Sequence, residues 1–440
     1  MQQVILGIIG GGTVGGGVFQ AIQRNAALME SRLGVRFKVA KVAVKAFDER
    51  RAVDIPMRFL TTSWKEVVND PSVNMVGEFM GGTTIAREVV LTALKLGKPV
   101  VTANKALISA HGEELFAAAK RYGANLHYEA SVAGGIPIIK VLREGLVGNR
   151  IVRIYGIVNG TCNYILTRMK QEGADFDVVL KDAQRLGYAE AEPSLDIDGH
   201  DSMHKIGILA SLAHGFWVNP KFIHVEGIRG ITQADIQFAA QLGYTIKLLG
   251  IVKTIGDCAG SGGCGAVQVS VYPALVPNAH LLASVNGVFN AVQVRGDVVG
   301  DTVYYGRGAG QDATASAVLS DLADAALDLK CGIKSRVKPF VPHERDGAVA
   351  PIGDVVCRYY VRLSVVDKPG TLAKIAAILA QAQIGISSVI QPEGHEGGSV
   401  PLILMIHDAT NANMQRALAK IGKLPQVKAP PVMLRVESFE

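Results

Sequence analysis

The sequence is poor in cysteine and in aromatic residues, and it has no long run of apolar residues. Its five cysteines are an odd number, lie far apart and include no CxxC pair, so neither a disulfide framework nor a zinc site is indicated. Aromatic residues make up 6% of the chain and the basic residues are scattered, which argues against a nucleic-acid groove. No apolar run reaches the roughly 18 residues that a membrane-spanning helix requires.

What is present is the composition of a folded protein with two or three domains. The chain has 440 residues, of which 49% are apolar, enough for sizeable cores. Its net charge of +6 suits anionic small molecules. The apolar N-terminal stretch lacks a basic leading region and runs directly into Gly10-Gly11-Gly12, unlike a signal peptide. We therefore expect a soluble, cytoplasmic protein with no nucleic-acid or membrane partner.

The first segment has the pattern of a dinucleotide-binding strand, turn and helix. An apolar run at 4–9 is followed by the glycine turn 10–15 and by an amphipathic stretch at 18–28. In this spacing, the first glycine permits the tight turn, the second lets the backbone approach a pyrophosphate, and the third lets helix and strand pack closely. The predicted cofactor contacts are Gly10, Gly12, Thr13, Val14 and Gly15. A glycine-rich turn without a ligand remains the alternative.

The segments that follow predict a doubly wound parallel sheet. Strand-like runs at 37–44, 73–80 and 99–102 alternate with helical patterns at 86–96 and 113–122. Ligands of such sheets bind at the carboxyl ends of the strands, and Lys105 follows one of these ends. Lys105 is therefore a candidate for contact with cofactor or substrate, and a solvated loop lysine is the alternative.

The end of the second strand bears on the choice of cofactor. An acid there would bind the ribose 2′-hydroxyl of NAD, whereas a cation would bind the 2′-phosphate of NADP. Lys45 follows the strand directly, Asp48 comes later, and Arg50 and Arg51 are close by. This order favours NADP, although Asp48 leaves NAD open.

The stretch 183–205 concentrates carboxylates ahead of a lysine. Asp201 and Lys205 are spaced i, i+4, so on a helix they share one face. A solvated surface ion pair is the ordinary explanation of such a pair. A divalent metal held by His200, His204 and nearby aspartates is a weaker alternative, because Lys205 would repel the ion. The other acids of the stretch are Glu190, Glu192, Asp196 and Asp198.

The rest of the middle part predicts a second sheet. Small residues at 129–137 lead into a helix at 138–144, a strand at 151–158 precedes a polar turn at 159–164, and 267–273 and 291–294 alternate like strands. The glycine-rich segment 256–265 has the composition of a loose hairpin loop.

Seven motifs together resemble the homoserine dehydrogenase family of the long bacterial type, over essentially the whole chain. The family interconverts L-aspartate 4-semialdehyde and L-homoserine with NAD(P)H, on the route to threonine, methionine and isoleucine. The motifs are GIIGGGTVGGGV, VVTANKALIS, YEASVAGGIP, GIVNGTCNYIL, GYAEAEPSLDIDGHDSMHK, PNAHLLASVNGVFNAV and YYGRGAGQDATASAV.

The resemblance implies a role for each matching residue. Lys205 corresponds to the acid/base that protonates the developing alkoxide, with Lys105 beside the nicotinamide and the substrate. Glu190 and Asp201 correspond to substrate-binding carboxylates, with Asp196 alongside. One departure is Glu192-Pro193, where the family usually has Asp-Pro, which puts only the local loop geometry in doubt.

The resemblance also implies further cofactor contacts and a cation site. Gly187 and Gly308, with Lys45 and Lys105, would contact the cofactor. A loop of mainly backbone carbonyls would hold a monovalent cation, expected to be sodium, since hard oxygen ligands suit such an ion. That loop is formed by Glu129, Val132, Gly134 and Ile136.

The C-terminal part restarts as a separate unit. Strand and helix patterns from 359 to 436 follow the order βαββαβ, a ferredoxin-like arrangement. The turn at 367–372 and the stretch 384–387 resemble an ACT domain, which commonly binds amino acids where two domains pair. We expect feedback inhibition by L-threonine; a tail used only for oligomerisation is the alternative.

The predicted fold class is α/β, with an N-terminal Rossmann-like domain, a middle α+β domain and a C-terminal ferredoxin-like (ACT) domain. The family resemblance suggests a homodimer or homotetramer formed through the middle sheet. A catalytically silent amino-acid sensor and a dehydrogenase of another amino-acid semialdehyde remain as alternatives. The predicted boundaries are 1–130 for the NAD(P)-binding domain, completed by the helix 310–330, 131–309 for the substrate-binding, catalytic and dimerisation domain, 333–354 for a linker, and 355–440 for the ACT domain.

Overall fold

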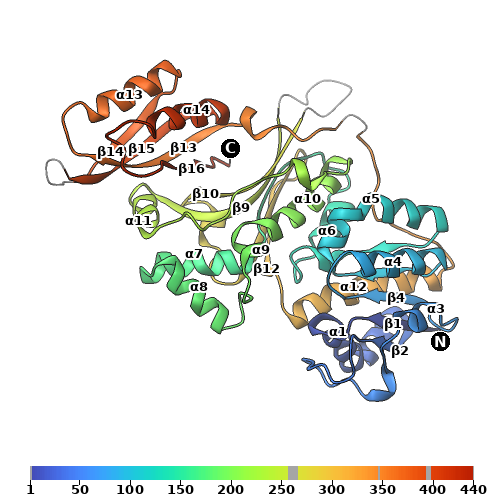
Figure 1. The fold of residues 1–440 in the computed structure, drawn as a ribbon. Helices are drawn as coiled ribbons and strands as arrows, with labels where there is room; N and C mark the ends of the chain where they lie inside the picture. Colours follow the sequence, from blue (N-terminus) through green and yellow to red (C-terminus); the bar gives the residue numbers. More distant parts are fainter. Residues whose placement is uncertain (1, 256–265, 345–346, 393–397, 440) are drawn as a thin grey trace.

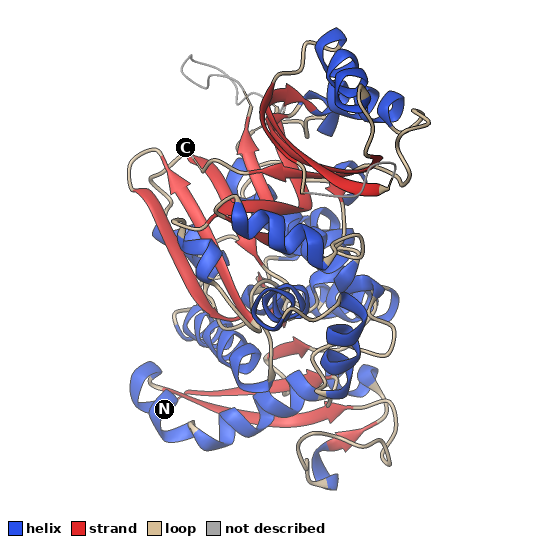
Figure 2. Cartoon of the chain, turned by 90° about the vertical axis from the view of Figure 1, so that its left-hand side faces the viewer, coloured by secondary structure: helices blue, strands red, loops and turns tan. Residues whose placement is uncertain are grey.

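The fold is known from a computed structural model that describes residues 2–255, 266–344, 347–392 and 398–439. Three units follow one another along the chain, with the middle unit between the other two (Figure 1). Figure 2 shows them stacked, the N-terminal unit at one end and the C-terminal unit at the other. Among the described helices, none is both long and apolar enough to cross a membrane.

The N-terminal unit contains a six-stranded parallel sheet with the strand order β3-β2-β1-β4-β5-β6. Strands β1 and β5 carry continuous apolar runs, as expected where helices cover both faces of a sheet, whereas basic residues interrupt β2. The parallel sheet confirms the predicted doubly wound fold. The strands are β1 (Gln2–Ile9), β2 (Val35–Ala43), β3 (Leu60–Thr61), β4 (Met75–Glu78), β5 (Val100–Thr102) and β6 (Leu126–His127).

Helices from distant parts of the chain cover the two faces of this sheet. On one face, α1 packs against α12, which comes almost 300 residues later, and both contribute to one apolar core. On the other face, α3, α4 and α5 share a second core with the middle unit. The helices are α1 (Thr13–Arg24), α2 (Ala26–Leu33), α3 (Trp64–Asn69), α4 (Thr84–Lys95), α5 (Lys105–Tyr122) and α12 (Gln311–Lys330).

The middle unit is built on antiparallel strands. Helices α7, α10 and α11 pack on one face of the sheet, and the turn Leu281–Ser284 with Phe439 lies on the other. The strands are β7 (Ile151–Ile157), β8 (His224–Val225), β9 (Tyr244–Thr254), β10 (Val267–Pro277), β11 (Phe289–Gly296) and β12 (Gly300–Arg307). The helices are α6 (Ile138–Lys140), α7 (Gly160–Glu172), α8 (Phe176–Arg185), α9 (Ser194–Ile197), α10 (His200–His214) and α11 (Gln233–Gln241).

The C-terminal unit has the predicted order βαββαβ, and its sheet continues the middle one. Strand β16 pairs in parallel with β10, with Ala274 opposite Arg435, so that one ten-stranded sheet runs through both units. The sequence analysis did not predict this junction. The elements are β13 (Val356–Val366), α13 (Thr371–Gln381), β14 (Ile386–Ile390), β15 (Ser399–Thr410), α14 (Asn411–Ile421) and β16 (Val432–Val436).

Buried polar groups hold the two units together at this junction. Glu437, which is fully buried, accepts hydrogen bonds from Tyr272 at 2.8 Å and from Tyr155 at 3.2 Å and pairs with Lys253. Asp235 of α11, also fully buried, forms an ion pair with Arg362 of β13 at 2.7 Å. Because unpaired buried charges are costly, these pairs disfavour separation of the units.

Several local expectations need correction. The stretch 138–144 does not form one regular helix: α6 gives way to a π-helical turn at Val141–Gly145, which widens the backbone spiral. Strands β9 and β12 were not predicted, although both are fully formed. Within the predicted linker, Phe340 stacks with Phe116 and contacts Trp217; the linker itself stays a prediction. The predicted loop 256–265 lies outside the described residues.

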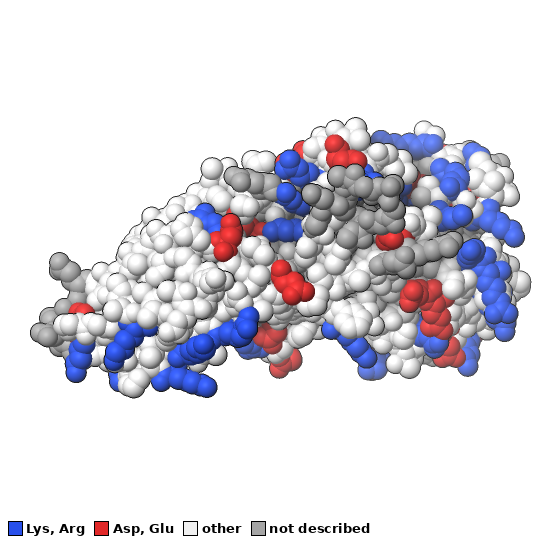
Figure 3. Space-filling view, turned by 90° about the horizontal axis from the view of Figure 1, so that it is seen from above, with Lys and Arg blue, Asp and Glu red and all other residues white. Residues whose placement is uncertain are grey.

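Charged side chains are unevenly distributed on the surface. On the face drawn in Figure 3, a broad uncharged area covers the end formed by the C-terminal unit, with basic side chains along one border. Acidic side chains on this face lie mostly over the other two units.

Candidate active site

The glycine turn has the geometry that a pyrophosphate requires. Gly10 has φ +101°, and a Cβ on Gly15 would lie 1.8 Å from the Gly10 carbonyl oxygen, so only glycine fits at both positions. At Gly12 a Cβ would meet no atom within 4 Å, which leaves open space before helix α1. No side chain caps this helix, so the N–H groups of Thr13 and Val14 face an open anion position.

The loop after β2 lies beside this turn. Arg51 donates to the carbonyl oxygens of Ala46 at 3.0 Å and Phe47 at 2.6 Å, and its side chain comes within 3.6 Å of a Cβ placed on Gly11. Lys45 is exposed at the end of the strand. Arg51 therefore lies at the edge of the candidate cofactor site.

The centre of the site is the carboxylate of Asp201, which bridges two lysines from different units. Its Oδ1 lies 3.0 Å from Nζ of Lys105, the first residue of α5. Its Oδ2 lies 2.7 Å from Nζ of Lys205, one turn further along α10. The Asp201 side chain is only 4% exposed, whereas that of Lys105 is 34% exposed, so the surface ion pair that the spacing suggested is in fact part of a triad centred on a buried carboxylate.

Local structure fixes the start of α10. Gly199 precedes the helix with φ +87°, a conformation that glycine adopts without strain. Asp201 then stands in the first turn, where the helix dipole favours a negative charge. Lys205 donates a second hydrogen bond, at 2.7 Å, to the carbonyl oxygen of Val158 at the end of β7. The lysine is thereby held from two elements.

Asn159 joins a second carboxylate to this triad. Its side-chain amide donates to Asp201 at 2.9 Å and to Asp196 at 2.7 Å. Thr161 donates to the Tyr188 carbonyl oxygen at 2.6 Å and lies 3.3 Å from Asp196. Glu190 is exposed beside them. The structure thus brings Lys105, Lys205, Asp196 and Asp201 together and leaves Glu190 at the rim, while Asn159 and Thr161 were missed as site residues.

Electrostatic interactions favour the charged forms of Asp201 and Lys105. Burial alone would raise the pKa of Asp201, but the charges of Lys205 and Lys105 hold it well below its ordinary value. Burial alone would lower the pKa of Lys105, yet Asp201, then Asp196 and Glu190, raise it overall. Burial and the charge of Asp201 raise the pKa of Asp196. The two lysines therefore lie among the carboxylates of the acidic stretch.

A buried network positions Lys105 and was also missed. Asn104 caps α5 by accepting from Leu107 N, and it donates to the carbonyl oxygens of Met80 and Gly82. Thr102 accepts from Asn104 N at 3.0 Å and donates to Glu78 at 2.6 Å. Glu78 is fully buried, and burial raises its pKa to about 7 against the hydrogen bonds that it accepts. The ends of β4 and β5 are thus tied together beneath the lysine.

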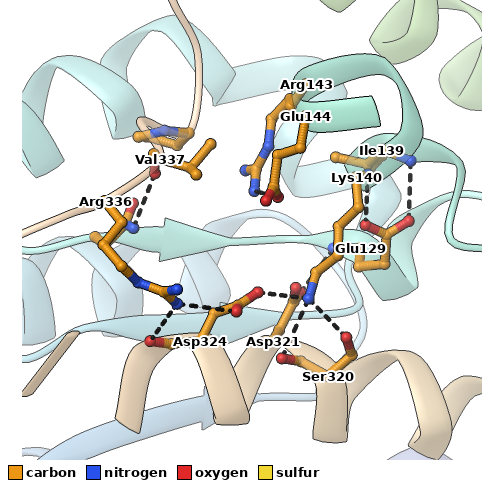
Figure 4. Close-up of polar contacts among 12 residues, drawn as sticks. Glu129, Ile139, Lys140, Arg143, Glu144, Ser320, Asp321, Asp324, Arg336 and Val337 are labelled. Atoms are coloured by element: carbon orange, nitrogen blue, oxygen red, sulfur yellow. Dashed lines mark hydrogen bonds and ion pairs between the residues drawn. The ribbon is translucent and has the colours of Figure 1, made fainter. Parts of the chain in front are cut away.

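The predicted cation loop lies between the N-terminal and middle units. The Glu129 carboxylate accepts from Ile139 N at 2.9 Å and Lys140 N at 2.8 Å, so it caps α6 (Figure 4). Lys140 in turn binds Ser320 and Asp324 of α12. Within the described part of the chain, the carbonyl oxygens of Val132 and Gly134 accept no hydrogen bond. Free carbonyl oxygens in a folded loop fit a monovalent cation.

The two further predicted cofactor contacts differ in their surroundings. Gly308 adjoins the cation loop, since a Cβ on Gly134 would lie 2.8 Å from its carbonyl oxygen. Gly187 lies in the turn after α8 with φ +76°, and no described hydrogen bond joins it to the glycine turn.

His204 contacts the Ser109 hydroxyl at 2.9 Å. The described residues contain no cluster of three metal-binding side chains.

The fold and the site together define a class of enzyme. The features that do so are the strand order of the parallel sheet, the glycine turn and the triad of two lysines around a carboxylate. In a 3-2-1-4-5-6 parallel sheet, a dinucleotide binds across the ends of β1 and β4, and the end of β5 places Lys105 within the triad. The protein is an NAD(P)-dependent oxidoreductase.

Comparisons with known proteins identify the family. Family profiles match residues 10–129 as the NAD-binding domain of homoserine dehydrogenase, 137–323 as homoserine dehydrogenase and 359–426 as an ACT domain. Over its whole length the chain is 43% identical to the homoserine dehydrogenase of Pseudomonas aeruginosa, also matched in full. The chain belongs to the homoserine dehydrogenase family, and it has the family's activity.

Solved structures agree with this placement. The crystal structure of a homoserine dehydrogenase from Thiobacillus denitrificans is 43% identical and superposes with a TM-score of 0.93, covering 100% of this chain and 99% of that one. A hyperthermophilic archaeal homoserine dehydrogenase in complex with NADPH is 28% identical, with a TM-score of 0.61, over 74% of this chain and 98% of its own.

Replacement of Glu78 tests the buried network. A carboxyl whose pKa is raised from an ordinary value of about 4.3 to about 7 retains its proton longer in the folded state. The free energy of unfolding therefore falls as pH rises from about 4 to about 7, by an amount on the order of 3 to 4 kcal/mol. Glu78→Gln cannot ionise and should flatten this fall. Thermal midpoints between pH 5 and pH 8 measure it.

The exposed Glu113 of α5 provides the control. Glu113→Gln should follow the parent protein across the whole pH range. Curves of Glu78→Gln and parent that run parallel would show that Glu78 is ionised in the folded protein throughout, contrary to the network described here.

Proposed function

We propose that Lys205 is the proton donor and acceptor when L-aspartate 4-semialdehyde and L-homoserine interconvert. The observation that carries this is the triad in which Asp201 holds Lys105 and Lys205 together. An ammonium group has three N–H donors, and Lys205 uses two of them, on Asp201 and Val158. The third is free for the substrate oxygen.

Lys105 has a supporting role in this proposal. A bound nicotinamide cofactor supplies the hydride chemistry, and the oxygen on the reacting carbon gains negative charge when the aldehyde is reduced. Lys105 stays an ammonium group because Asp201 raises its pKa, so it stabilises that charge. Lys205 then delivers the proton to the oxygen, and in the reverse direction it receives the proton.

The acidic stretch would bind the α-ammonium group of the substrate. Asp201 is already engaged by two lysines and Asn159, so it orders the lysines and adds negative charge to the site. Asp196 is half-buried and Glu190 is exposed at the rim, which leaves their carboxylate oxygens more accessible to an ammonium group. Asp196 and Glu190 would therefore contact the ammonium group directly, and Asp201 would bind the substrate through its negative charge and through the lysines that it orders.

NADP is the proposed cofactor, with NAD as the second possibility. The glycine turn, with Thr13 and Val14, would hold the pyrophosphate, and Lys45 and Arg51 at the site's edge would favour a 2′-phosphate. Gly187 and Gly308 remain proposed contacts. The archaeal relative is described in complex with NADPH, which supports this preference.

A monovalent cation, taken to be sodium, would bind the loop formed by Glu129, Val132, Gly134 and Ile136. The free carbonyl oxygens of Val132 and Gly134 support this, and Gly308 lies against the same loop. The cation would therefore order the contact between the middle unit and the cofactor side of the site.

Spectrophotometry of NADPH formation from L-homoserine tests the site. Lys205→Ala should lower kcat by about 10²- to 10⁴-fold, the usual contribution of a positioned acid/base. The parent should work better with NADP than with NAD, and adding sodium to a sodium-free choline buffer should raise its activity.

Lys221 provides the matched control, because it is exposed and lies outside the site. Lys221→Ala should retain the parent's kcat. Full turnover by Lys205→Ala would end the role given to Lys205, and turnover only with a different amino-acid semialdehyde would replace the substrate.

The C-terminal unit is the proposed site of regulation by L-threonine. It matches an ACT domain, and a broad uncharged surface covers this end of the molecule (Figure 3). Millimolar L-threonine should inhibit the intact enzyme with a saturable dependence, and D-threonine should not. Unchanged activity with L-threonine would leave the unit without this function.

The protein is proposed to form a homodimer or homotetramer through the middle sheet. Strand β12 is an edge strand, and Val303 and Tyr305 on it are 37% and 58% exposed. Edge strands with exposed apolar side chains are prone to pair with another chain.

Light scattering tests this contact. Val303→Lys should shift the mass toward the monomer, because a charge would be buried in the interface. Val147→Lys, at an exposed position outside the sheet, should not. A monomeric parent protein would contradict the proposal.

The family activity and the reduced cysteines support a place in the cytoplasm and in the biosynthesis of threonine, methionine and isoleucine. The described cysteines Cys162, Cys331 and Cys357 are free thiols, as is usual in a reducing compartment.

A further inference from the structure

An ion pair between buried Arg435 and partly exposed Glu226 joins the C-terminal unit to the middle unit near the acidic stretch. Arg435 on β16 is fully buried and donates to both carboxylate oxygens of Glu226 at 2.9 Å. It also donates to Asn411 at 2.8 Å, and its guanidinium group lies 4.4 Å from the ring centre of Tyr272. A bidentate pair of this kind fixes direction as well as distance.

Glu226 is held at its backbone as well as at its side chain. It directly follows β8, which pairs with β10, and its N–H donates to the Val271 carbonyl oxygen at 2.8 Å. His224 contacts the same carboxylate at 2.7 Å. The hydrogen bonds from His224 and Arg435 outweigh burial and lower the pKa of Glu226 to about 2, so the pair stays charged at neutral pH.

The residues after Glu226 rest directly on the segment that carries the candidate substrate carboxylates. Ile228 N donates to the Ile197 carbonyl oxygen at 2.8 Å. A Cβ on Gly227 would lie only 2.2 Å from that same oxygen. Arg229 forms a bidentate pair with Asp198 at 2.5 and 3.0 Å. Segment 227–229 thus supports the turn between Asp196 and Asp201.

A second contact reaches the start of α10. A Cβ on Gly199 would lie 3.2 Å from the Glu226 carbonyl oxygen, so the backbone of Glu226 packs beside the residue that precedes the helix. Helix α10 carries Asp201 and Lys205 and also packs on β10. Glu226 is therefore connected to both ends of the turn, and Arg435 is connected to Glu226.

We infer that Arg435 and Glu226 are positioning residues for the substrate carboxylates, so that the C-terminal unit is a working part of the substrate site. This rests on the proposed role of Asp196 and Asp201 in binding substrate. Displacement of the pair would move segment 227–229, and with it the turn that sets the distance between those carboxylates. Neither residue touches the cofactor or the reacting atoms.

The other ion pair of the junction provides a matched control. Asp235 and Arg362 also join the two units through a buried bidentate pair, at 2.7 and 3.0 Å. No hydrogen bond described for this pair reaches segment 194–201. Variants of either pair should therefore lower the stability of the protein. Only variants of Glu226 and Arg435 should also weaken substrate binding.

Steady-state kinetics of the full-length enzyme separate these roles. Glu226→Gln and Arg435→Lys should each raise KM for L-homoserine about tenfold, with kcat and KM for NADP changed by less than about threefold. Arg362→Lys should lower the thermal midpoint by a similar amount and leave KM for L-homoserine unchanged.

A backbone variant tests the same link with the ion pair intact. Gly227→Ala introduces a Cβ against the Ile197 carbonyl oxygen and should raise KM for L-homoserine. Gly230→Ala is its control, because a Cβ there meets no atom within 4 Å. This pair of variants decides the matter if Glu226→Gln and Arg435→Lys do not fold: an unchanged KM in Gly227→Ala then overturns the inference.

Asp196→Asn serves as the reference for the underlying assignment. If it raises KM while Glu226→Gln and Arg435→Lys only lower the thermal midpoint, as Arg362→Lys does, the inference is overturned and the proposed substrate site stands. If Asp196→Asn and Asp201→Asn both leave KM unchanged, the substrate assignment falls and the inference with it. If Glu226→Gln and Arg435→Lys raise KM for NADP as much as KM for L-homoserine, the inference is also contradicted, because the cofactor site would then be displaced as well.

Discussion

The site depends on one buried carboxylate, that of Asp201, held between the ammonium groups of Lys105 and Lys205. A buried charge is tolerated only where its partners are in place. Here the partners come from α5 of the N-terminal unit and from α10 of the middle unit, so the triad forms only when both units are folded and docked. The same contact fixes the distance between α5 and α10 at the site.

The surrounding structure serves to keep this triad in register. Glu78, Thr102 and Asn104 tie the strand ends beneath Lys105, and Glu129 with Lys140 anchors α12 to the loop between the units (Figure 4). The continuous ten-stranded sheet extends this order to the C-terminal unit. The C-terminal and middle units share this sheet and are joined by ion pairs across it, so neither can shift against the other without breaking hydrogen bonds.

Much of the fold could be predicted from the sequence because its signals are local. The glycine turn, the apolar strands of the parallel sheet and the βαββαβ order of the C-terminal unit all follow from short patterns. The acidic stretch with Lys205 could also be found, although spacing alone suggested a surface pair. Features that depend on distant contacts could not be predicted, among them the buried role of Glu78, the pairing of β16 with β10, and the Arg435–Glu226 contact. Their partners lie between 24 and 209 residues away, and no local pattern encodes such a meeting.

The sequence by itself determined which groups could do the chemistry: a glycine turn before a helix, two lysines and a cluster of carboxylates. It did so because backbone conformation and helix spacing depend on neighbouring residues. Only the tertiary structure decided which of these groups meet. It joined Lys105 to Lys205 through Asp201 and left Glu190 at the rim of the site. It also paired Arg435 with Glu226, which precedes the segment that packs beside Asp196. The physical reason why these groups meet is burial, because a charged group that is excluded from water requires a partner of opposite charge. Burial is a property of the folded chain as a whole, so no short stretch of sequence determines it.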